Sequence, residues 1–258
     1  MMTLSLTPDA ALAFLLVLCR TATLVALAPG IGARYVPPMA KLGVAVVVSV
    51  ALMPMAAARG EVPVELLPFA LAIAREFLVG AGLAFVINVL FWGAEFGGHA
   101  AGLQMGFALS EIFDPETGEE QSVSGAFYYV FALALFFALD GHAHLLAGLA
   151  RSFELAPLGL GAPRPEAVRT LIGASAEVFE LGLRLGAPAM LALLIASAAL
   201  GFVARAVPQM NVFFVGYPAK VAVGILVMAL ACPLTAAAFA GALPRLERMA
   251  LQFAMGMG

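Results

Sequence analysis

The chain has 258 residues, of which 63% are hydrophobic and only 11% are charged, and its mean hydropathy is +1.04. A single soluble core cannot bury this much apolar surface, so the composition places the chain in a membrane or in a membrane-derived assembly. The net charge of −3 provides no basic footprint for nucleic acid, and we expect no nucleic-acid partner.

Six apolar segments are candidate membrane helices, because a spanning helix needs roughly 20 mostly apolar residues. In chain order they are 10–29, 42–58, 66–94, 125–139, 185–204 and 221–244. The last two carry no charge and predict spanning helices outright, whereas the other four are shorter or contain a polar interruption. The first basic residue, Arg20, lies inside the first apolar segment, so this segment does not resemble a signal peptide and we expect a retained helix.

The fold class that follows is an all-α membrane protein of about six hydrophobic helices with Gly- and Pro-broken hairpins. No linker of disordered composition and no repeat of fixed period divides the chain, so we predict one domain over residues 1–258. Loop Lys and Arg residues fall six on one side and four on the other in a six-helix arrangement, which leaves the membrane orientation open.

Three ionisable residues interrupt the apolar helices, namely Arg20, Arg75 and Glu76. A charge at the centre of a lipid-exposed helix costs about 2.5–3.5 kcal/mol on insertion scales, so we expect all three side chains to face protein. Arg20 should find a carboxylate or a carbonyl partner, in this chain or in another subunit.

Helix breakers and small residues indicate helices that pack on other helices. Pro54, Pro188 and Pro233 each remove a backbone donor from an apolar run. Glycines recur at four-residue spacing, which lets helix backbones approach closely; these are Gly93/Gly97, Gly98/Gly102/Gly106 and Gly182/Gly186.

Two longer intervals are less apolar. Residues 151–180 contain several prolines and glycines and then an amphipathic stretch from Glu166, which indicates a loop leading into a surface helix; a plain connecting loop is the favoured interpretation. Residues 95–124 hold many carboxylates and no Lys or Arg. This one-sided charge is typical either of a solvated acidic loop outside the membrane or of a distinct polar environment.

Other functional classes find little support. The pair His142 and His144, with the carboxylate of Asp140, could contribute to a metal site. A catalytic metal site usually needs three protein ligands, and no further strong ligand cluster appears, so a polar cluster at a helix end is the better interpretation. Cys19 and Cys232 lie far apart in apolar segments and are interpreted as packing residues. A secondary transporter would show two matching half-repeats, and none is convincing. We therefore expect no enzyme activity, no metal and no cofactor.

Two stretches carry more specific information. The stretch 201–220 combines two prolines, a glycine and several polar residues with two apolar ones: Arg205, Pro208, Gln209, Asn211, Val212, Phe213, Gly216, Pro218 and Lys220. Pro208 prevents helix continuation, so one helix should end there and the next should start near Gly216 and Pro218, with Lys220 in its first turn. The second stretch combines Gln104, Met105, Gly106 and Phe107 with Asp114 and Pro115.

These stretches resemble the R-x-x-P-Q-x-N-V-F-x-x-G-x-P-x-K signature and the central Q-M-G-F and D-P elements of the FliR family. The turn around Pro29, Gly30, Gly32 and Arg34 and the helix around Glu76, Gly80 and Phe85 are similar to the family's first turn and third helix, in the family's order. The residues Asn211-Val212-Phe213 resemble the flagellar members more than their injectisome counterpart, SctT, which remains the alternative.

The resemblance implies a subunit of the flagellar type III export gate in the bacterial inner membrane, at the flagellar basal body. It implies FliP and FliQ as ring partners, FlhB at the entrance, and unfolded flagellar proteins as cargo in transit. It also implies that 104–124 forms a plug in the channel, with the carboxylates and turn residues Glu111, Asp114, Pro115, Gly118, Glu119 and Glu120. The open alternative for these residues is an acidic loop outside the ring.

Overall fold

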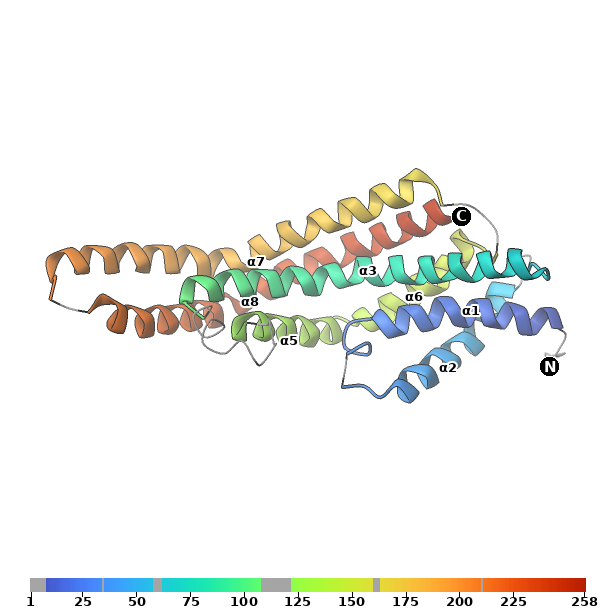
Figure 1. The fold of residues 1–258 in the computed structure, drawn as a ribbon, viewed down its shortest axis with the longest axis horizontal. Coiled ribbons are helices and arrows are strands. Elements are labelled where there is room, and N and C mark those ends of the chain that lie inside the picture. Colours follow the sequence, from blue (N-terminus) through green and yellow to red (C-terminus); the bar gives the residue numbers. More distant parts are fainter. Residues whose placement is uncertain (1–7, 34, 58–61, 108–121, 160–162, 210) are drawn as a thin grey trace. The chain divides into compact units, whose positions relative to one another are not determined.

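A computed structural model of the chain describes residues 8–33, 35–57, 62–107, 122–159, 163–209 and 211–258. Within these residues, all the regular structure is helical (Figure 1). The helices are α1 (Pro8–Leu27), α2 (Pro38–Ala57), α3 (Leu66–Met105), α5 (Val123–Ala138), α6 (Gly141–Leu155), α7 (Pro165–Ala206) and α8 (Val212–Met257).

Five of these helices are long and apolar enough to cross a membrane: α1, α2, α3, α7 and α8. α5 and α6 pass the same test as a pair bent by 70°, which would make a sixth span. The predicted all-α membrane class is therefore confirmed. α6 was not foreseen, and α3 continues to Met105 instead of ending near residue 94. The amphipathic stretch after Glu166 is not a separate surface helix, because α7 continues from Pro165 into the apolar segment without a break.

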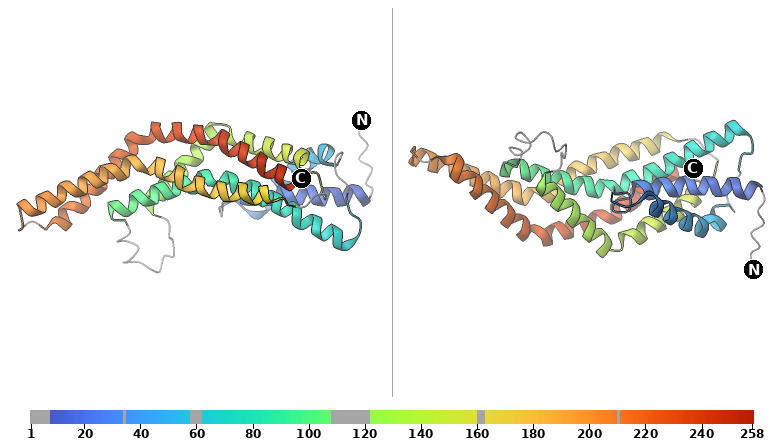
Figure 2. Two further views of the ribbon diagram at one scale, coloured as in Figure 1. Left: turned by 90° about the horizontal axis from the view of Figure 1, so that it is seen from above. Right: turned by 60° about the horizontal axis from the view of Figure 1, so that its bottom comes forward.

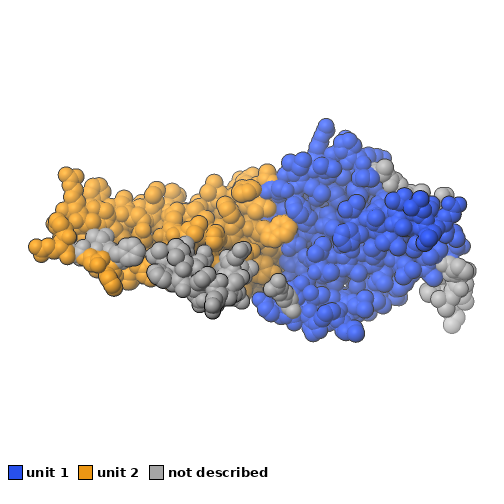
Figure 3. Space-filling model, viewed as in Figure 1, with its two compact units in different colours: residues 1–89, 140–175, 244–258 blue, residues 90–139, 176–243 orange. Residues whose placement is uncertain are grey.

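The described chain divides into two compact units (Figure 3). Unit 1 comprises residues 1–89, 140–175 and 244–258, and unit 2 comprises residues 90–139 and 176–243. Three of the four boundaries fall inside α3, α7 and α8, and the fourth lies between α5 and α6. The prediction of one domain stays a prediction.

Unit 1 has a hydrophobic core built from α1, the C-terminal half of α2, α3, α6, the start of α7 and the end of α8. Its fully buried members include Leu16, Val17, Val79, Phe153 and Phe253. Close packing of α1 on α3 depends on a glycine, because a Cβ added at Gly80 would lie 2.5 Å from the carbonyl oxygen of Arg20. Asn88 donates a hydrogen bond to the Leu27 carbonyl at 2.8 Å and so satisfies one of the orphan acceptors at the C-terminus of α1.

Unit 2 is held by aromatic and glycine contacts. Phe91 on α3 meets Phe136 on α5 and Phe239 on α8, with ring centroids 5.5 Å and 6.2 Å apart. α3 crosses α7 at predicted glycine positions: a Cβ at Gly97 would lie 2.5 Å from the Gly182 carbonyl oxygen and 3.0 Å from the Gly186 nitrogen. The two backbones touch here, as the four-residue glycine spacing predicts. The two views of Figure 2 show the first part of α8 running beside the last part of α7.

Candidate functional site

The connection between α7 and α8 interrupts the helix where the sequence predicts it. The amide of Val207 still donates to the Val203 carbonyl at 2.9 Å, and Pro208 then ends the ladder because it lacks an N–H group and disfavours a helical Val207. The next helix starts earlier than expected, since the Asn211 carbonyl already accepts hydrogen bonds from Phe214 and Val215. Lys220 consequently lies in the third turn of α8 and not in its first.

The end of α3 explains the Gln-Met-Gly-Phe stretch. Gly106 has φ 96° and follows the last helical residue, Met105. The Phe107 amide donates to the Gly102 carbonyl at 3.0 Å, and the Gly106 amide donates to the Leu103 carbonyl at 3.2 Å. This pair of bonds is the Schellman motif, in which glycine adopts the left-handed conformation that stops a helix. Gly106 therefore terminates α3.

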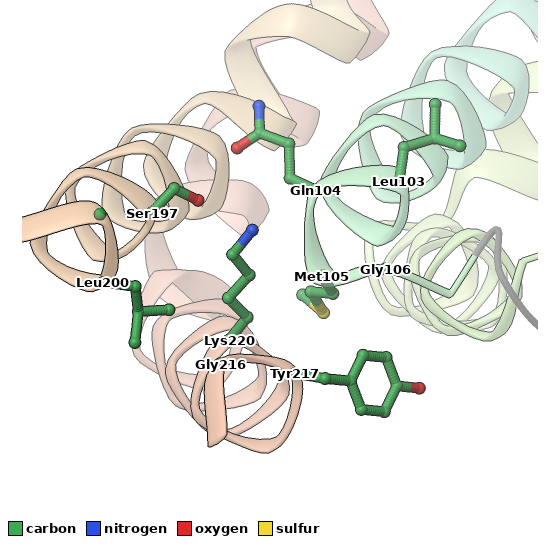
Figure 4. Close-up of a pocket in the computed structure, with 10 residues that line it drawn as sticks. Leu103, Gln104, Met105, Gly106, Ser197, Leu200, Gly216, Tyr217 and Lys220 are labelled. Atoms are coloured by element: carbon green, nitrogen blue, oxygen red, sulfur yellow. The ribbon is translucent and has the colours of Figure 1, made fainter. Parts of the chain in front are cut away.

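A pocket of about 430 Å³ in unit 2 brings the two motif stretches together (Figure 4). Its walls come from the end of α3, the last turns of α7 and the first turns of α8. The lining residues are Leu103, Gln104, Met105, Gly106, Ser197, Leu200, Gly201, Gly216, Tyr217 and Lys220. Of the sites proposed from the sequence, Gln104, Met105, Gly106, Gly216 and Lys220 thus share one cavity.

The remaining motif residues lie elsewhere. Phe107 is half-buried and does not line the pocket. Five residues in and beside the connection between α7 and α8 are exposed: Arg205, Pro208, Gln209, Asn211 and Pro218. The side chains of Val212 and Phe213 fall outside the described part of the structure, as do Met210 and Arg34. No sequence pattern indicated that Ser197, Leu200 or Tyr217 would line the pocket, because a wall residue on a long apolar helix has no local signature.

The pocket combines apolar walls with one cation. Leu103, Leu200 and Met105 supply hydrocarbon and thioether surface, and Figure 4 shows the Lys220 side chain extending toward Gln104 and Ser197. Among the residues that the structure describes, Lys220 makes no hydrogen bond or ion pair. A half-buried ammonium group that has no partner among the described residues is suited to pairing with a carboxylate.

The predicted plug is described only at its two ends. Glu111, Asp114, Pro115, Gly118, Glu119 and Glu120 lie outside the described residues. At the near end, Gly98 and Gly102 both lie inside α3. Their role is close contact: a Cβ at Gly98 would lie 2.5 Å from the Ser124 carbonyl oxygen.

At the far end of the same stretch, Ser122 caps α5. Its hydroxyl accepts a hydrogen bond from the Gly125 amide at 3.0 Å. Ser122 and Ser124 are buried against Gly102, so the flanks of residues 108–121 lie side by side. A serine directly before an apolar run is a recognisable N-cap signal, so the start of α5 could have been predicted from the sequence.

The three predicted buried charges form one network in unit 1. Arg20 and Glu76 are fully buried and Arg75 is 7% exposed. Arg20 Nε lies 2.5 Å from Glu76 Oε2, and Arg75 Nη1 lies 3.5 Å from Glu76 Oε1. Two guanidinium groups thus share one carboxylate inside the unit, and the carboxylate partner of Arg20 belongs to the same chain.

Neutral groups complete this network. Arg20 donates to Ser152 Oγ at 3.1 Å and to the Ala156 carbonyl at 2.8 Å, and its guanidinium lies 4.2 Å from the centre of the Phe153 ring. Arg75 donates to the Pro157 carbonyl at 2.7 Å and to the Met257 carbonyl at 2.5 Å. The charges therefore tie α1 and α3 to the end of α6, the turn after it and the last turn of α8.

The polar residues around Asp140 lie at the bend between α5 and α6 and in the first turn of α6. Asp140 adopts φ 55° at the bend between α5 and α6, and His144 Nδ1 lies 3.2 Å from Glu247 Oε2 in a partly exposed pair. Across the described residues, no group of three or more His, Cys, Asp or Glu side chains is arranged to hold a metal ion.

Comparison with known proteins gives a consistent result. The chain matches the family described as bacterial export proteins, family 1, over residues 11–246. It is 34% identical to the flagellar biosynthetic protein FliR of Escherichia coli (strain K12), over 85% of this chain and 84% of that protein. It is 31% identical to the protein of the same name from Bacillus subtilis (strain 168), over 84% of each chain. It is 24% identical to the Yop proteins translocation protein T of Yersinia pestis, over 69% of each chain.

Proposed function

Because the chain belongs to the bacterial export proteins of family 1, and so is a membrane component of a type III protein-export apparatus, we propose that it is a subunit of the flagellar export gate. In this proposal it joins FliP and FliQ around a channel for unfolded flagellar proteins, with FlhB nearby, in the inner membrane at the flagellar basal body. It acts as a channel component and not as an enzyme. An injectisome subunit is the alternative, and the higher identity to the flagellar relatives favours the flagellar role.

The observation that carries this proposal is the length of the apolar helices. α3, α7 and α8 contain 40, 42 and 46 residues. At 1.5 Å per residue these helices are about 60–70 Å long, whereas the hydrocarbon core of a bilayer is about 30 Å thick. A single membrane can therefore cover only about half of each helix.

Apolar side chains are nevertheless exposed over much of α7 and α8. On α7 they run from Val168 to Val203, and on α8 from Phe214 to Leu234, with Met255 near the end of the helix. Surface of this kind that lies beyond the hydrocarbon core needs another apolar cover, since soluble proteins rarely expose large contiguous apolar patches. Helices of neighbouring subunits provide that cover in a closed ring.

The pocket with Lys220 is our candidate docking point for one neighbouring helix. A carboxylate on that helix would pair with the Lys220 ammonium and with the Gln104 amide, while Leu103 and Leu200 pack on its apolar neighbours. The connection at residues 207–211 joins α7 to α8 and thereby sets the positions of the two pocket walls that these helices supply. We therefore expect the break to matter for assembly.

Replacement of Lys220 tests the proposal. Lys220→Ala and, more strongly, Lys220→Glu should lower the amount of chain recovered with tagged FliP and FliQ by about tenfold or more, because truncating a buried charge pair typically costs 2–5 kcal/mol. The amount of chain in the membrane should stay unchanged. The matched control is Arg169→Glu, an exposed cation outside the pocket.

Two results would contradict the proposal. Full recovery of Lys220→Glu with both partners would show that the pocket is not a docking point. A native chain that never associates with FliP and FliQ would contradict the assembly itself.

We further propose that residues 104–124 contribute the seal of the resting channel. Support comes from the two flanks, because Gly102 of α3 packs on Ser122 and Ser124. The five carboxylates in the sequence between these flanks are compatible with water or polar neighbours and not with lipid.

A further inference from the structure

One strip of α3 carries the ionisable side chains Glu95 and His99 along an otherwise apolar part of unit 2. The two residues lie one turn apart, and Gly102 and Gly106 continue the line at helical spacing. Both ionisable side chains are half-buried. We call these four residues the α3 strip. It ends at Gly106, where the helix itself ends.

The start of α5 covers one edge of the α3 strip. A Cβ added at Gly102 would overlap the Ser124 hydroxyl, and a Cβ added at Gly125 would lie 3.7 Å from Glu95 Cγ. Within the described part of the chain, the His99 imidazole has no hydrogen-bond or ion-pair partner. The strip therefore presents a polar ring that the described residues of this chain do not satisfy.

The contacts between α3 and α8 set the level of each residue within unit 2. Phe91 meets Phe239 with ring centroids 6.2 Å apart, and Met105 packs on Gly224, where an added Cβ would overlap its thioether. The two helices thus run antiparallel. Residues that lie equally far from the contact between Met105 and Gly224 are therefore level with each other.

An ionisable and an apolar side chain share one such level. His99 precedes Met105 by six residues and Leu230 follows Gly224 by six. Leu230 is 71% exposed, and Phe127 on α5 is an exposed apolar residue of the same part of unit 2. At one depth in a bilayer, every side of a lone helix bundle meets the same medium. An imidazole without a partner is unsuited to hydrocarbon and a bare leucine is unsuited to water, so the two sides of unit 2 face different surroundings.

We propose that the α3 strip is channel wall: in the assembled gate it contacts water and the unfolded chain in transit, while Leu230 on α8 is covered by apolar helices. This inference rests on the proposed function, because it assigns the face of the subunit that borders the channel. An extended chain carries unpaired backbone N–H and C=O groups. The Glu95 carboxylate accepts hydrogen bonds and an imidazole both donates and accepts them, so the strip offers exchangeable polar contacts instead of an apolar surface that would retain the chain.

Charge favours water over a neighbouring carboxylate as the partner of His99. Glu95 lies one turn away on the same strip and would repel a second carboxylate there. Five carboxylates also follow Gly106 in the sequence before the next basic residue, Arg151; these are Glu111, Asp114, Glu116, Glu119 and Glu120. Such groups need water or polar neighbours, and the strip ends directly before them in the chain.

Thiol labelling of the assembled gate tests the proposal. The chain carries only two cysteines, Cys19 and Cys232, and both are replaced by alanine in all variants. His99→Cys places a thiol on the strip, and Leu230→Cys is the level-matched control. The gate is purified with tagged FliP and FliQ in lipid nanodiscs and treated with a membrane-impermeant, cationic methanethiosulfonate. Apolar surroundings raise the pKa of a thiol and deplete its reactive thiolate, so position 99 should react about tenfold or more faster than position 230.

A second variant guards against a folding defect at position 99. Glu95→Cys, one turn earlier on the strip, should also react faster than Leu230→Cys. Slow labelling at positions 95 and 99, equal to that at position 230, would overturn the proposal and assign the strip to a subunit contact or to lipid. Equally fast labelling at all three positions would overturn it as well, because the control side would then be in water. Failure to recover the chain with FliP and FliQ would contradict the proposed function itself, and the channel wall with it.

Discussion

The buried charges of unit 1 lead to an asymmetric prediction about stability. Two guanidinium groups, those of Arg20 and Arg75, share the single carboxylate of Glu76. Replacing Glu76 leaves two buried cations without an anion. Replacing Arg20 leaves Arg75 and Glu76 as a pair with no net charge. The carboxylate should therefore be the more costly member of the network to lose.

The magnitudes follow from the contacts. Removing one partner of a buried ion pair typically costs 3–5 kcal/mol, so Glu76→Met should lower the free energy of unfolding by about 5 kcal/mol. Arg20→Met forfeits the bonds to Ser152 and to the Ala156 carbonyl, but methionine fills much of the space, and we expect a loss of about 2–3 kcal/mol. The difference between the two variants should be about 2 kcal/mol or more.

Unfolding of the purified chain by a denaturing detergent, followed by circular dichroism, measures both values. Glu180→Met is the matched control, because Glu180 pairs with Arg184 at 2.7 Å on an exposed helix face, where such pairs contribute less than about 0.5 kcal/mol. If Arg20→Met destabilised the chain as much as Glu76→Met, the reasoning from charge balance would be refuted.

Two further predictions concern unit 2. Gly97→Ala should lower the free energy of unfolding by about 2 kcal/mol, since its Cβ would press on the backbone of α7. The control Gly43→Ala should be neutral or slightly stabilising, because a Cβ at Gly43 would have no atom within 4 Å. Equal effects of the two changes would argue against the close helix crossing. Deleting residues 111–121 should raise the permeability of membranes containing the assembled gate to small solutes without reducing assembly, and unchanged leakage in an intact complex would show that this stretch is not the seal.

The sequence predicted the features that depend on local pattern. Apolar length identified most of the helices, and Pro208 correctly marked the end of α7. The energetic cost of a charge in lipid was enough to predict that Arg20, Arg75 and Glu76 face protein, and the structure buries all three. Such inferences succeed because each needs only a residue and its immediate neighbours in the chain.

Features that depend on distant residues could not be predicted in this way. Arg20 bonds to Ala156 and Arg75 to Met257, across 136 and 182 residues. α6 was missed because His142, His144, Arg151 and Glu154 lower its hydropathy, so a search for long apolar runs passes over it. Gly106 belongs to the Gln-Met-Gly-Phe element, and only the hydrogen bonds of the structure show that it ends a helix.

The bond from Arg75 to the Met257 carbonyl also constrains the order in which the protein can form. Residues 90–139 and 176–243, which make up unit 2, are all synthesised before the last segment of unit 1. Until Met257 leaves the ribosome, one acceptor of the Arg75 guanidinium does not yet exist. Contacts this distant in sequence must wait for loop closure, and an unfinished unit exposes surface that invites misassembly. A nascent chain can therefore complete unit 2 first. The buried charge network of unit 1 can form in full only after residues 244–258 have been translated.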